Sequence, residues 1–365
     1  MGIEQPGSRN AVIDGWRGIS VLMVIVGHFF GFRAKALFPV EALDSVGLPF
    51  GTKSFAIVSS LGVLGVCFFF MISGYLITSL LVAEEEKRGR VSLKAFYVRR
   101  VFRIMPAFYA YVLVVFLLGR AGLILVPDEA LLRSSVYVCN FSGFSCSWWL
   151  AHTWSLAVEE QFYLIWPMIF AFAAVWRRAA AITILAALLV ASAFFEPLSG
   201  FTYIMAGVFV ALAPRTRDRL SGIDRRVIWL ALALLVAFPV APSSIGRFLM
   251  LAQPLMVAVV LFGTLFGAPG GILDAVLRHP WLSKIGLVSY SLYLWQQLSL
   301  APVMWGGKAT DADALYALSN VALGLAFIPL AIASYLLIEK PLTAVGHRIS
   351  RKILDQSGSA VRRTV

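Results

Sequence analysis

The chain has 365 residues, of which 60% are hydrophobic and 14% charged, and its mean hydropathy is +0.84. A soluble domain of this length would carry about a quarter charged residues, so the composition excludes an ordinary soluble enzyme and favours many membrane-spanning helices. The formal net charge of +12 would suit nucleic acid if it formed one basic patch. The Lys and Arg residues instead lie in alternate loops, so we expect no nucleic-acid partner.

The apolar residues fall in long runs rather than in the alternating stretches of an outer-membrane barrel. The sequence therefore predicts an all-α, polytopic membrane protein with about ten transmembrane helices around a central cavity. We expect an integral-membrane domain over residues 1–345 and a basic cytoplasmic tail over residues 346–365. The ten predicted spans are residues 12–32, 55–82, 101–119, 155–176, 180–195, 199–213, 227–241, 247–267, 284–303 and 316–338.

The distribution of Lys and Arg predicts the orientation of these spans. With the N-terminus in the cytoplasm, the inner segments hold 23 of these residues and the outer loops hold seven. Cytoplasmic loops of membrane proteins carry such an excess, so we expect both termini to be cytoplasmic. We expect no cleavable signal peptide, because the first span has no charged region before it and no small-residue cleavage site.

Apart from Asp14 at its start, the first span carries two ionisable side chains, Arg17 and His28. Their separation of eleven residues is three helical turns with ~20° left over, so both lie on one helix face, ~16 Å apart along the axis. Taken singly, Arg17 could be a side chain snorkelling to the interface, and His28 could be a packing histidine. Ionisable groups inside a span usually mark function, and the shared face favours a path through the membrane with chemistry on it.

The second span and the loop after it supply two further features. The span ends in F-F-F-M-I-S-G-Y-L-I-T, where Ser73 and Gly74 suit close helix packing and a cavity role for the Ser73 hydroxyl is the alternative. Ser92, in the following loop, could cap a short interfacial helix.

Three arginines, Arg99, Arg100 and Arg103, lead into the third span. Positive-inside topology and contacts with lipid phosphates would explain them. The alternative is a clamp for a polyphosphate, since the guanidinium fork binds phosphate through two hydrogen bonds. Pro106 interrupts the helical hydrogen bonds nearby and could open a niche.

Cys139 and Cys146 lie in the longest predicted external loop, roughly residues 120–154. A disulfide that closes this short turn is possible if the loop is extracytoplasmic. The sequence leaves equally open that the two thiols stay free.

Two adjacent carboxylates, Glu159 and Glu160, lie in the outer third of the fourth span. Such groups are costly in a membrane unless they are paired or hydrated, and they point ~100° apart on a helix. One Glu could sit at the interface while the other bridges to an Arg or His. Alternatively one of them, with Glu159 our preference, orients a histidine as a general base. His28 belongs to the same outer half, and His152 lies seven residues before Glu159.

The remaining spans differ in polarity. Residues 180–267 are nearly featureless apolar helices, which we interpret as scaffold and cavity wall. The ninth span, I-G-L-V-S-Y-S-L-Y-L-W-Q-Q, is rich in polar and aromatic residues that suit a polar substrate, although tyrosine girdles also occur without function. We expect no metal. The candidates for contact with the substrate or an oxyanion are Ser73, His152, Gln161, Tyr290 and Gln296.

Six segments, in order along the chain, together resemble the acyltransferase-3 family of bacterial integral-membrane O-acyltransferases. They are D-G-W-R-G-I with His28 following, F-F-F-M-I-S-G-Y-L-I, R-R-V-F-R-I-M-P, W-S-L-A-V-E-E-Q-F-Y-L-I-W-P, S-Y-S-L-Y-L-W-Q-Q and I-E-K-P-L. The resemblance implies a multi-pass protein of the bacterial cytoplasmic membrane. It also implies transfer of an acyl group, commonly acetyl, from cytoplasmic acyl-CoA to a hydroxyl of a cell-surface or secreted carbohydrate.

The resemblance also implies roles for individual residues. The family's Arg and His of the first span fall on Arg17 and His28, and its inner Arg-x-x-Arg falls on Arg100 and Arg103. Its Glu-Glu-Gln pattern falls on residues 159–161. Some members carry a His where this chain has Gln296, which leaves His28 as the better candidate for a base.

These residues suggest a mechanism. Arg100 and Arg103, with Arg99 beside them, bind the phosphates of acetyl-CoA, and the thioester arm runs along Arg17. His28, assisted by Glu159 or Glu160, deprotonates the acceptor hydroxyl. A transporter or flippase of a lipid-linked or small polar substrate is the alternative. That alternative predicts paired broken helices in corresponding halves, and the sequence shows no such symmetry.

Overall fold

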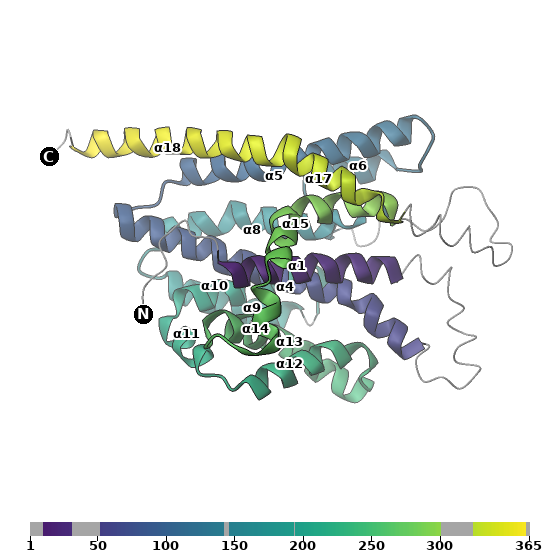
Figure 1. The fold of residues 1–365 in the computed structure, drawn as a ribbon. Helices are drawn as coiled ribbons and strands as arrows, with labels where there is room; N and C mark the ends of the chain where they lie inside the picture. Colours follow the sequence, from purple (N-terminus) through teal and green to yellow (C-terminus); the bar gives the residue numbers. More distant parts are fainter. Residues whose placement is uncertain (1–9, 31–51, 142–145, 193, 301–323, 363–365) are drawn as a thin grey trace. The chain divides into compact units, whose positions relative to one another are not determined.

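The computed structural model describes residues 10–30, 52–141, 146–192, 194–300 and 324–362. Within these residues every element is a helix, as the sequence predicts (Figure 1). Parts of the predicted first, fifth, ninth and last spans lie outside the described residues, namely residues 31–32, 193, 301–303 and 316–323. The helices are α1 (Ala11–His28), α4 (Thr52–Arg88), α5 (Leu93–Arg120), α6 (Asp128–Ser135), η2 (Cys139–Phe141), α7 (Ser147–Ala151), α8 (Thr153–Phe172), α9 (Arg177–Ser192), η4 (Glu196–Leu198), α10 (Ser199–Leu212), α11 (Pro214–Ser221), α12 (Arg225–Ala237), η5 (Phe238–Val240), α13 (Ser243–Phe266), α14 (Gly271–Leu277), α15 (Pro280–Ser299), α17 (Phe327–Ser334), η6 (Tyr335–Glu339) and α18 (Lys340–Arg362).

A described helix overlaps each predicted span, but only some of these helices could cross a membrane alone. By length and apolar character, four described stretches qualify, and a fifth does if α13 and α14, bent by 81°, form one span. Others are short: α9, α10 and α12 have 16, 14 and 13 residues, against the ~20 that a bilayer needs. The protein has membrane character, while the count of ten spans and the cytoplasmic termini stay predictions. The four stretches are Ala11–His28, Phe55–Arg88, Leu93–Arg120 and Phe327–Gln356.

The chain forms two compact units, and some of the boundaries between them fall inside α4 and α15. Unit 1 comprises Met1–Leu80, Val175–Ser289 and Ser299–Ala326. Unit 2 comprises Leu81–Ala174, Tyr290–Leu298 and Phe327–Val365.

Within unit 1, small residues let helix backbones approach closely. A Cβ atom on Gly74 of α4 would lie 1.9 Å from the Ile204 carbonyl oxygen of α10, so no larger residue fits. This contact confirms the predicted close packing at Gly74. On α1, the Trp16 ring stacks on Phe68 of α4 at 4.5 Å between centroids, and its indole N–H donates to the Thr264 hydroxyl at 2.8 Å.

Within unit 2, α5 and α18 run side by side (Figure 1). The Ser92 hydroxyl caps α5 as predicted, by accepting from the Ala95 N–H. The predicted short interfacial helix is wrong in one respect, because α5 continues through Pro106 to Arg120. Before α18, the chain makes a π-helical turn, η6, in which the Lys340 N–H bonds the Tyr335 carbonyl. Pro341 lacks an N–H, and this favours the wider turn.

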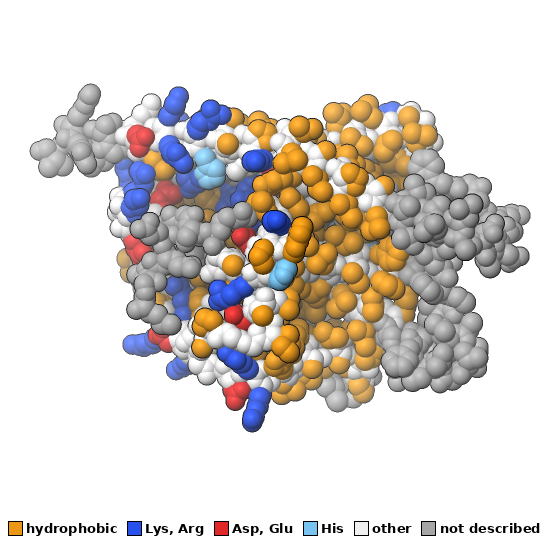
Figure 2. Space-filling view, viewed as in Figure 1, with side chains coloured by type: hydrophobic (Ala, Val, Ile, Leu, Met, Phe, Trp, Pro, Cys, Tyr) orange, Lys and Arg blue, Asp and Glu red, His pale blue; other side chains and the backbone are white. Residues whose placement is uncertain are grey.

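The surface of α17 and α18 changes character along its length. Hydrophobic side chains cover α17 and the start of α18, and Lys and Arg side chains gather over its C-terminal part (Figure 2). Leu337 is 76% exposed in the apolar part, whereas Arg348, Arg351 and Lys352 are exposed in the basic part. Such a change is typical of a helix that leaves the hydrocarbon for an anionic interface.

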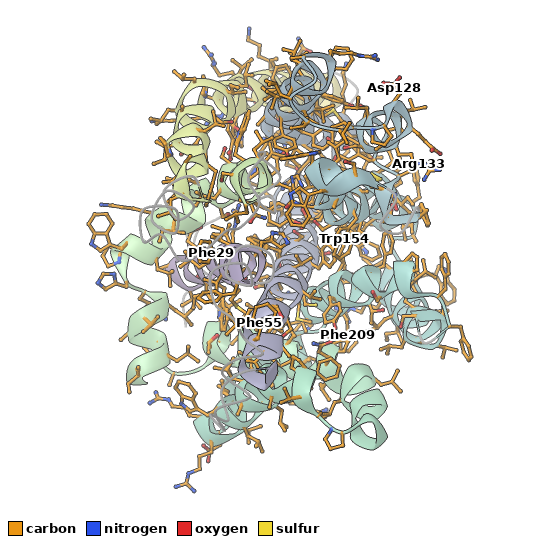
Figure 3. All side chains as sticks on the ribbon, turned by 90° about the vertical axis from the view of Figure 1, so that its right-hand side faces the viewer. Phe29, Phe55, Asp128, Arg133, Trp154 and Phe209 are labelled. Atoms are coloured by element: carbon orange, nitrogen blue, oxygen red, sulfur yellow. A yellow bond between two sulfur atoms is a disulfide. The ribbon has the colours of Figure 1, made fainter. Side chains whose placement is uncertain are left out.

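The predicted external loop is itself folded in unit 2. Helix α6 carries an exposed polar face, on which Asp128 and Arg133 point away from the other helices (Figure 3). Asp128 accepts from Arg120 at 2.9 Å, and Arg133 pairs with Glu129 one turn away. These exposed pairs contribute little stability, so the loop must be held by other contacts.

Candidate functional site

In unit 1, the two residues predicted to line a path through the membrane, Arg17 and His28, lie on α1. The helix is regular from Ala11 to His28, so Arg17 and His28 share a face, and both side chains are half-buried. Arg17 donates to the Ser289 hydroxyl of α15 at 3.2 Å. Ser73 is half-buried on α4 of the same unit.

In unit 2 the first of the three arginines is held by protein groups. Arg99 Nη2 forms an ion pair with Glu84 at 2.9 Å, and Nη1 donates to the Ser350 hydroxyl of α18 at 2.7 Å. Glu84 also accepts from the Ser92 N–H at 2.8 Å. Arg99 therefore ties the end of α4, the start of α5 and α18 together, and its predicted contact with phosphate stays a prediction.

Arg100 has a different environment. Its guanidinium carbon lies 5.7 Å from the Phe96 ring centroid and 5.3 Å from that of Tyr163 on α8. A cation against aromatic faces is stabilised without losing its hydrogen-bond donors. The Glu160 carboxylate attracts the Arg100 guanidinium electrostatically. Unit 2 thus brings together Arg100 and Glu160, with Arg103 one turn further along α5.

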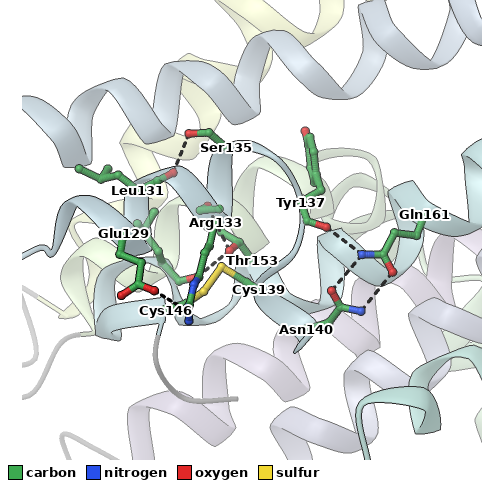
Figure 4. Close-up of a disulfide and its surroundings, with 12 residues drawn as sticks. Glu129, Leu131, Arg133, Ser135, Tyr137, Cys139, Asn140, Cys146, Thr153 and Gln161 are labelled. Atoms are coloured by element: carbon green, nitrogen blue, oxygen red, sulfur yellow. Dashed lines mark hydrogen bonds and ion pairs between the residues drawn. A yellow bond between two sulfur atoms is a disulfide. The ribbon is translucent and has the colours of Figure 1, made fainter. Parts of the chain in front are cut away.

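Gln161, beside these carboxylates, is anchored through its amide (Figure 4). Asn140 Nδ2 donates to Gln161 Oε1 at 3.1 Å, and Gln161 Nε2 donates to Asn140 Oδ1 at 3.0 Å. Gln161 Nε2 also donates to the Tyr137 carbonyl at 2.8 Å. Both amide protons of Gln161 are used in this way. The residue fixes the loop to α8, and Glu159 and Glu160 lie half-buried just before it.

The disulfide that the sequence left open is formed. Cys139 and Cys146 are bonded, with 5.9 Å between their Cα atoms (Figure 4). Because Cys139 directly precedes Asn140, the covalent bond and the amide pair hold the same turn of the loop.

His152 lies in an aromatic cluster. Its side chain is 3% exposed, and its ring centroid lies 5.2 Å from that of Tyr111 in an edge contact and 5.7 Å from that of Tyr293. The Tyr293 hydroxyl shares a hydrogen bond with Ser155 at 2.5 Å and reaches the His152 carbonyl at 3.1 Å. His152 is therefore packed as part of the interior of unit 2, and its predicted contact with substrate stays a prediction.

The polar residues of α15 join the helices of unit 2. The Tyr290 hydroxyl donates to the Ile104 carbonyl of α5 at 2.9 Å. Ser291 donates to Glu339 of η6 at 3.0 Å, and Gln297 donates to the Trp148 carbonyl at 2.8 Å. Gln296 is fully buried. Much of the polar character that suggested a substrate surface therefore serves helix packing.

The sequence reasoning missed Tyr137 and Asn140. Asn140 is 5% exposed and forms the amide pair with Gln161. Tyr137 has a positive φ of 57°. Its position next to a cysteine loop was the only available signal, and backbone dihedrals of this kind are not readable from one sequence. Across the described residues, no group of three or more His, Cys, Asp or Glu side chains could hold a metal ion.

Comparison with known proteins identifies the family. A sequence model described as an acyltransferase domain matches residues 10–339. The peptidoglycan O-acetyltransferase OatA of Listeria monocytogenes is 29% identical over 333 residues, which cover 78% of this chain and 48% of that protein. The O-acetyltransferase OatA of Staphylococcus aureus is 29% identical over 281 residues, which cover 64% of this chain and 45% of that protein.

The chain spans about half the length of these curated relatives. No solved structure matches it significantly. The family match includes every candidate site residue, from Arg17 to Gln296, and most of the described helices. The chain belongs to the acyltransferase-3 family.

Proposed function

We propose that the protein is a membrane O-acetyltransferase. It moves an acyl group, most commonly acetyl, from cytoplasmic acetyl-CoA to a hydroxyl of a cell-envelope carbohydrate, with the bacterial cytoplasmic membrane as its location. The observation that carries this proposal is the match of the acyltransferase domain to residues 10–339. The names of the relatives favour an O-acetyl product and peptidoglycan as the first acceptor to test.

The binding of the donor is assigned to α5. Arg100 and Arg103 contact the phosphates of acetyl-CoA, because guanidinium groups bind phosphate through paired, charge-assisted hydrogen bonds. Arg99, tied to Glu84 and Ser350, holds this end of α5 in place. Arg17, which reaches Ser289, lines the path of the thioester arm.

The chemistry is assigned to His28 with Glu159 or Glu160. The imidazole takes the proton of the acceptor hydroxyl, and the oxygen attacks the carbonyl carbon of the thioester. The carbon–sulfur bond then breaks, and the CoA sulfur leaves with the proton returned by the imidazolium. The carboxylate stabilises that imidazolium. Ser73 and Gln296 are candidates to stabilise the oxyanion, and Tyr290 joins them only by exchanging its bond to the Ile104 carbonyl for one to the oxyanion.

The first test measures acetyl transfer by purified protein in lipid nanodiscs. The donor is radiolabelled acetyl-CoA, and the acceptor is a soluble oligosaccharide of alternating N-acetylglucosamine and N-acetylmuramic acid. We expect the wild-type protein to release CoA and label the oligosaccharide, and His28→Ala to lose transfer by about 1,000-fold or more, since a general base contributes 10²–10⁴-fold.

His279→Ala is the matched control, because His279 is exposed just before α15. It should leave transfer unchanged. Wild-type levels of transfer in His28→Ala would refute the role of His28. A wild-type protein that neither binds nor consumes acetyl-CoA would refute the proposed acetyltransferase function and favour the transporter hypothesis.

A further inference from the structure

Tyr137, between α6 and η2, has a backbone conformation that is unusual for an aromatic residue. Its φ of 57° places it in the left-handed region. Bulky residues seldom adopt this conformation, and they keep it only where surrounding contacts fix it. Residues held in this way cluster at ligand sites.

The backbone of Tyr137 is fixed from several sides. Its N–H donates to the Ser134 carbonyl at 3.0 Å, and its carbonyl accepts from Gln161 at 2.8 Å. The ring stacks on Phe108 of α5, with 4.4 Å between the centroids. The amide pair between Asn140 and Gln161 then joins the next turn to α8 (Figure 4). The phenol is therefore held in one orientation by contacts that do not involve its hydroxyl.

The hydroxyl of Tyr137 differs from those of two neighbouring tyrosines. Tyr109 donates to the Ser135 carbonyl at 3.0 Å, and Tyr290 donates to the Ile104 carbonyl at 2.9 Å. The Tyr137 hydroxyl is buried and has no hydrogen-bond partner among the residues that the structure describes. Buried hydroxyls nearly always have a partner, so a group from outside this set of residues is expected there.

The electrostatic neighbours of this hydroxyl are Glu160, which is one of the proposed catalytic groups, and Tyr109. Burial, followed by the negative charge of the Glu160 carboxylate and by Tyr109, raises the pKa of Tyr137 above its ordinary value. The phenol therefore stays protonated and acts as a hydrogen-bond donor over the physiological pH range. A donor beside a carboxylate suits a ligand that carries hydroxyl groups, because the two can satisfy the acceptor and donor sides of one alcohol.

We propose that the Tyr137 hydroxyl is a substrate-binding group, which donates a hydrogen bond to the carbohydrate acceptor beside Glu160. The proposal rests on the proposed function. The loop of Tyr137 is the predicted extracytoplasmic loop, so the acceptor, and not the acyl donor, is the substrate that it meets. The disulfide and the amide pair keep the phenol in place before the acceptor binds, which lowers the entropy cost of binding.

The variant Tyr137→Phe tests this assignment. It removes the hydroxyl and retains the stack on Phe108 and the backbone bond to Gln161. We expect the KM for the N-acetylglucosamine–N-acetylmuramic acid oligosaccharide to rise about tenfold, the usual effect of losing one hydrogen bond in a binding site. The KM for acetyl-CoA should stay unchanged. The thermal midpoint should not fall, because the lost hydroxyl bonds no described group.

Tyr109→Phe is the matched control, since that hydroxyl has a partner within the loop. It should leave both KM values unchanged and lower the thermal midpoint slightly. If Cys139 and Cys146 do not react with a thiol reagent, the disulfide is intact and the loop of each variant is folded.

Two outcomes would overturn the proposal. One is a wild-type KM for the oligosaccharide in Tyr137→Phe. The other is a fall in thermal midpoint with both KM values rising together, which would indicate a structural role. Titration of the oligosaccharide onto wild-type protein and Tyr137→Phe, without donor, measures the contact independently of catalysis. Equal affinities there would exclude the contact even if acetyl transfer itself were never observed.

Discussion

The N-terminal end of α5 and the N-terminal half of α8 share one arrangement but use different kinds of bond. In each segment two adjacent residues have different roles, because one is bonded to other parts of the protein and we assign the other to the substrates. Arg99 is tied to Glu84 and Ser350 while Arg100 lies against Phe96 and Tyr163. On α8, Gln161 is tied to the loop through Asn140 and Tyr137, and Glu160 precedes it.

The bonds that anchor each segment suit the side of the membrane predicted for it. At α5 they are an ion pair and a hydrogen bond to a hydroxyl, which a solvated cytoplasmic face tolerates. The tie at α8 is an amide pair next to a disulfide, and disulfides persist on the oxidising side of a membrane. In both segments, two adjacent residues look functional in the sequence. One of the two, Arg99 or Gln161, mainly anchors its segment to other parts of the protein. The comparison teaches that adjacent polar residues on a helix point to different partners, because successive positions turn by ~100°.

The largest expected effect in this comparison comes from Arg100. Arg100→Gln should lower kcat/KM for acetyl-CoA by about 100-fold, or ~2.7 kcal/mol, because a charged partner of the donor phosphates is lost. Arg100→Lys should lose less, since it keeps the charge and the contact with Phe96 and Tyr163 but lacks the planar fork. Steady-state transfer with varied acetyl-CoA measures both.

Lys94→Gln is the matched control for Arg100, because it removes an exposed positive charge from the first turn of the same helix. It should leave kcat/KM within about twofold of the wild type, as expected for a solvated surface charge. An unchanged KM for acetyl-CoA in Arg100→Gln would end the assignment of α5 to the donor phosphates.

The amide pair gives an effect of intermediate size. Asn140→Ala and Gln161→Ala should each lower the free energy of unfolding by about 2 kcal/mol, since each removes both hydrogen bonds of the amide pair. Gln161→Ala should lose somewhat more, because it also removes the bond to the Tyr137 carbonyl. The double variant should lose scarcely more than Gln161→Ala alone, because that change has already removed both bonds of Asn140 to Gln161. Unfolding in detergent under oxidising conditions, followed by tryptophan fluorescence, gives the three values.

Ser135→Ala provides the comparison for this cycle, because its hydroxyl bonds the Leu131 carbonyl one turn away in the same helix. We expect a loss below about 0.5 kcal/mol for such a local bond. Additive losses for Asn140→Ala and Gln161→Ala would show that the two amides stabilise the protein separately.

Local signals in the sequence predicted much of the fold. The apolar runs give the positions of the helices, Ser92 predicts the start of α5, and Gly74 predicts a close helix contact. Each depends on residues within a few turns of one another. The end of the helix after Ser92 was missed, because packing against α18 supports α5 through Pro106.

The partners of the site residues could not be predicted, because they are distant in sequence. Ser350 lies 251 residues from Arg99, and Tyr290 lies 186 residues from Ile104. Spacing along one helix gives the shared face of Arg17 and His28, but it cannot show which of Arg99 and Arg100 is tied down. The positive φ of Tyr137 is likewise set by packing on Phe108 and by Gln161, neither of which the local sequence indicates.

The smallest expected effect separates Arg99 from its neighbour most clearly. Arg99→Gln should lower the free energy of unfolding by about 1 kcal/mol, since its ion pair with Glu84 is partly exposed, with side-chain exposures of 23% and 10%. The KM for acetyl-CoA should rise no more than about twofold, because α5 is loosened while Arg100 and Arg103 are retained. Arg88→Gln controls for charge, since that side chain is exposed and makes a long contact, 3.5 Å, with the Leu354 carbonyl. If Arg99→Gln raised the KM as much as Arg100→Gln, both arginines would bind phosphate, and the division of work between adjacent residues would hold for α8 alone.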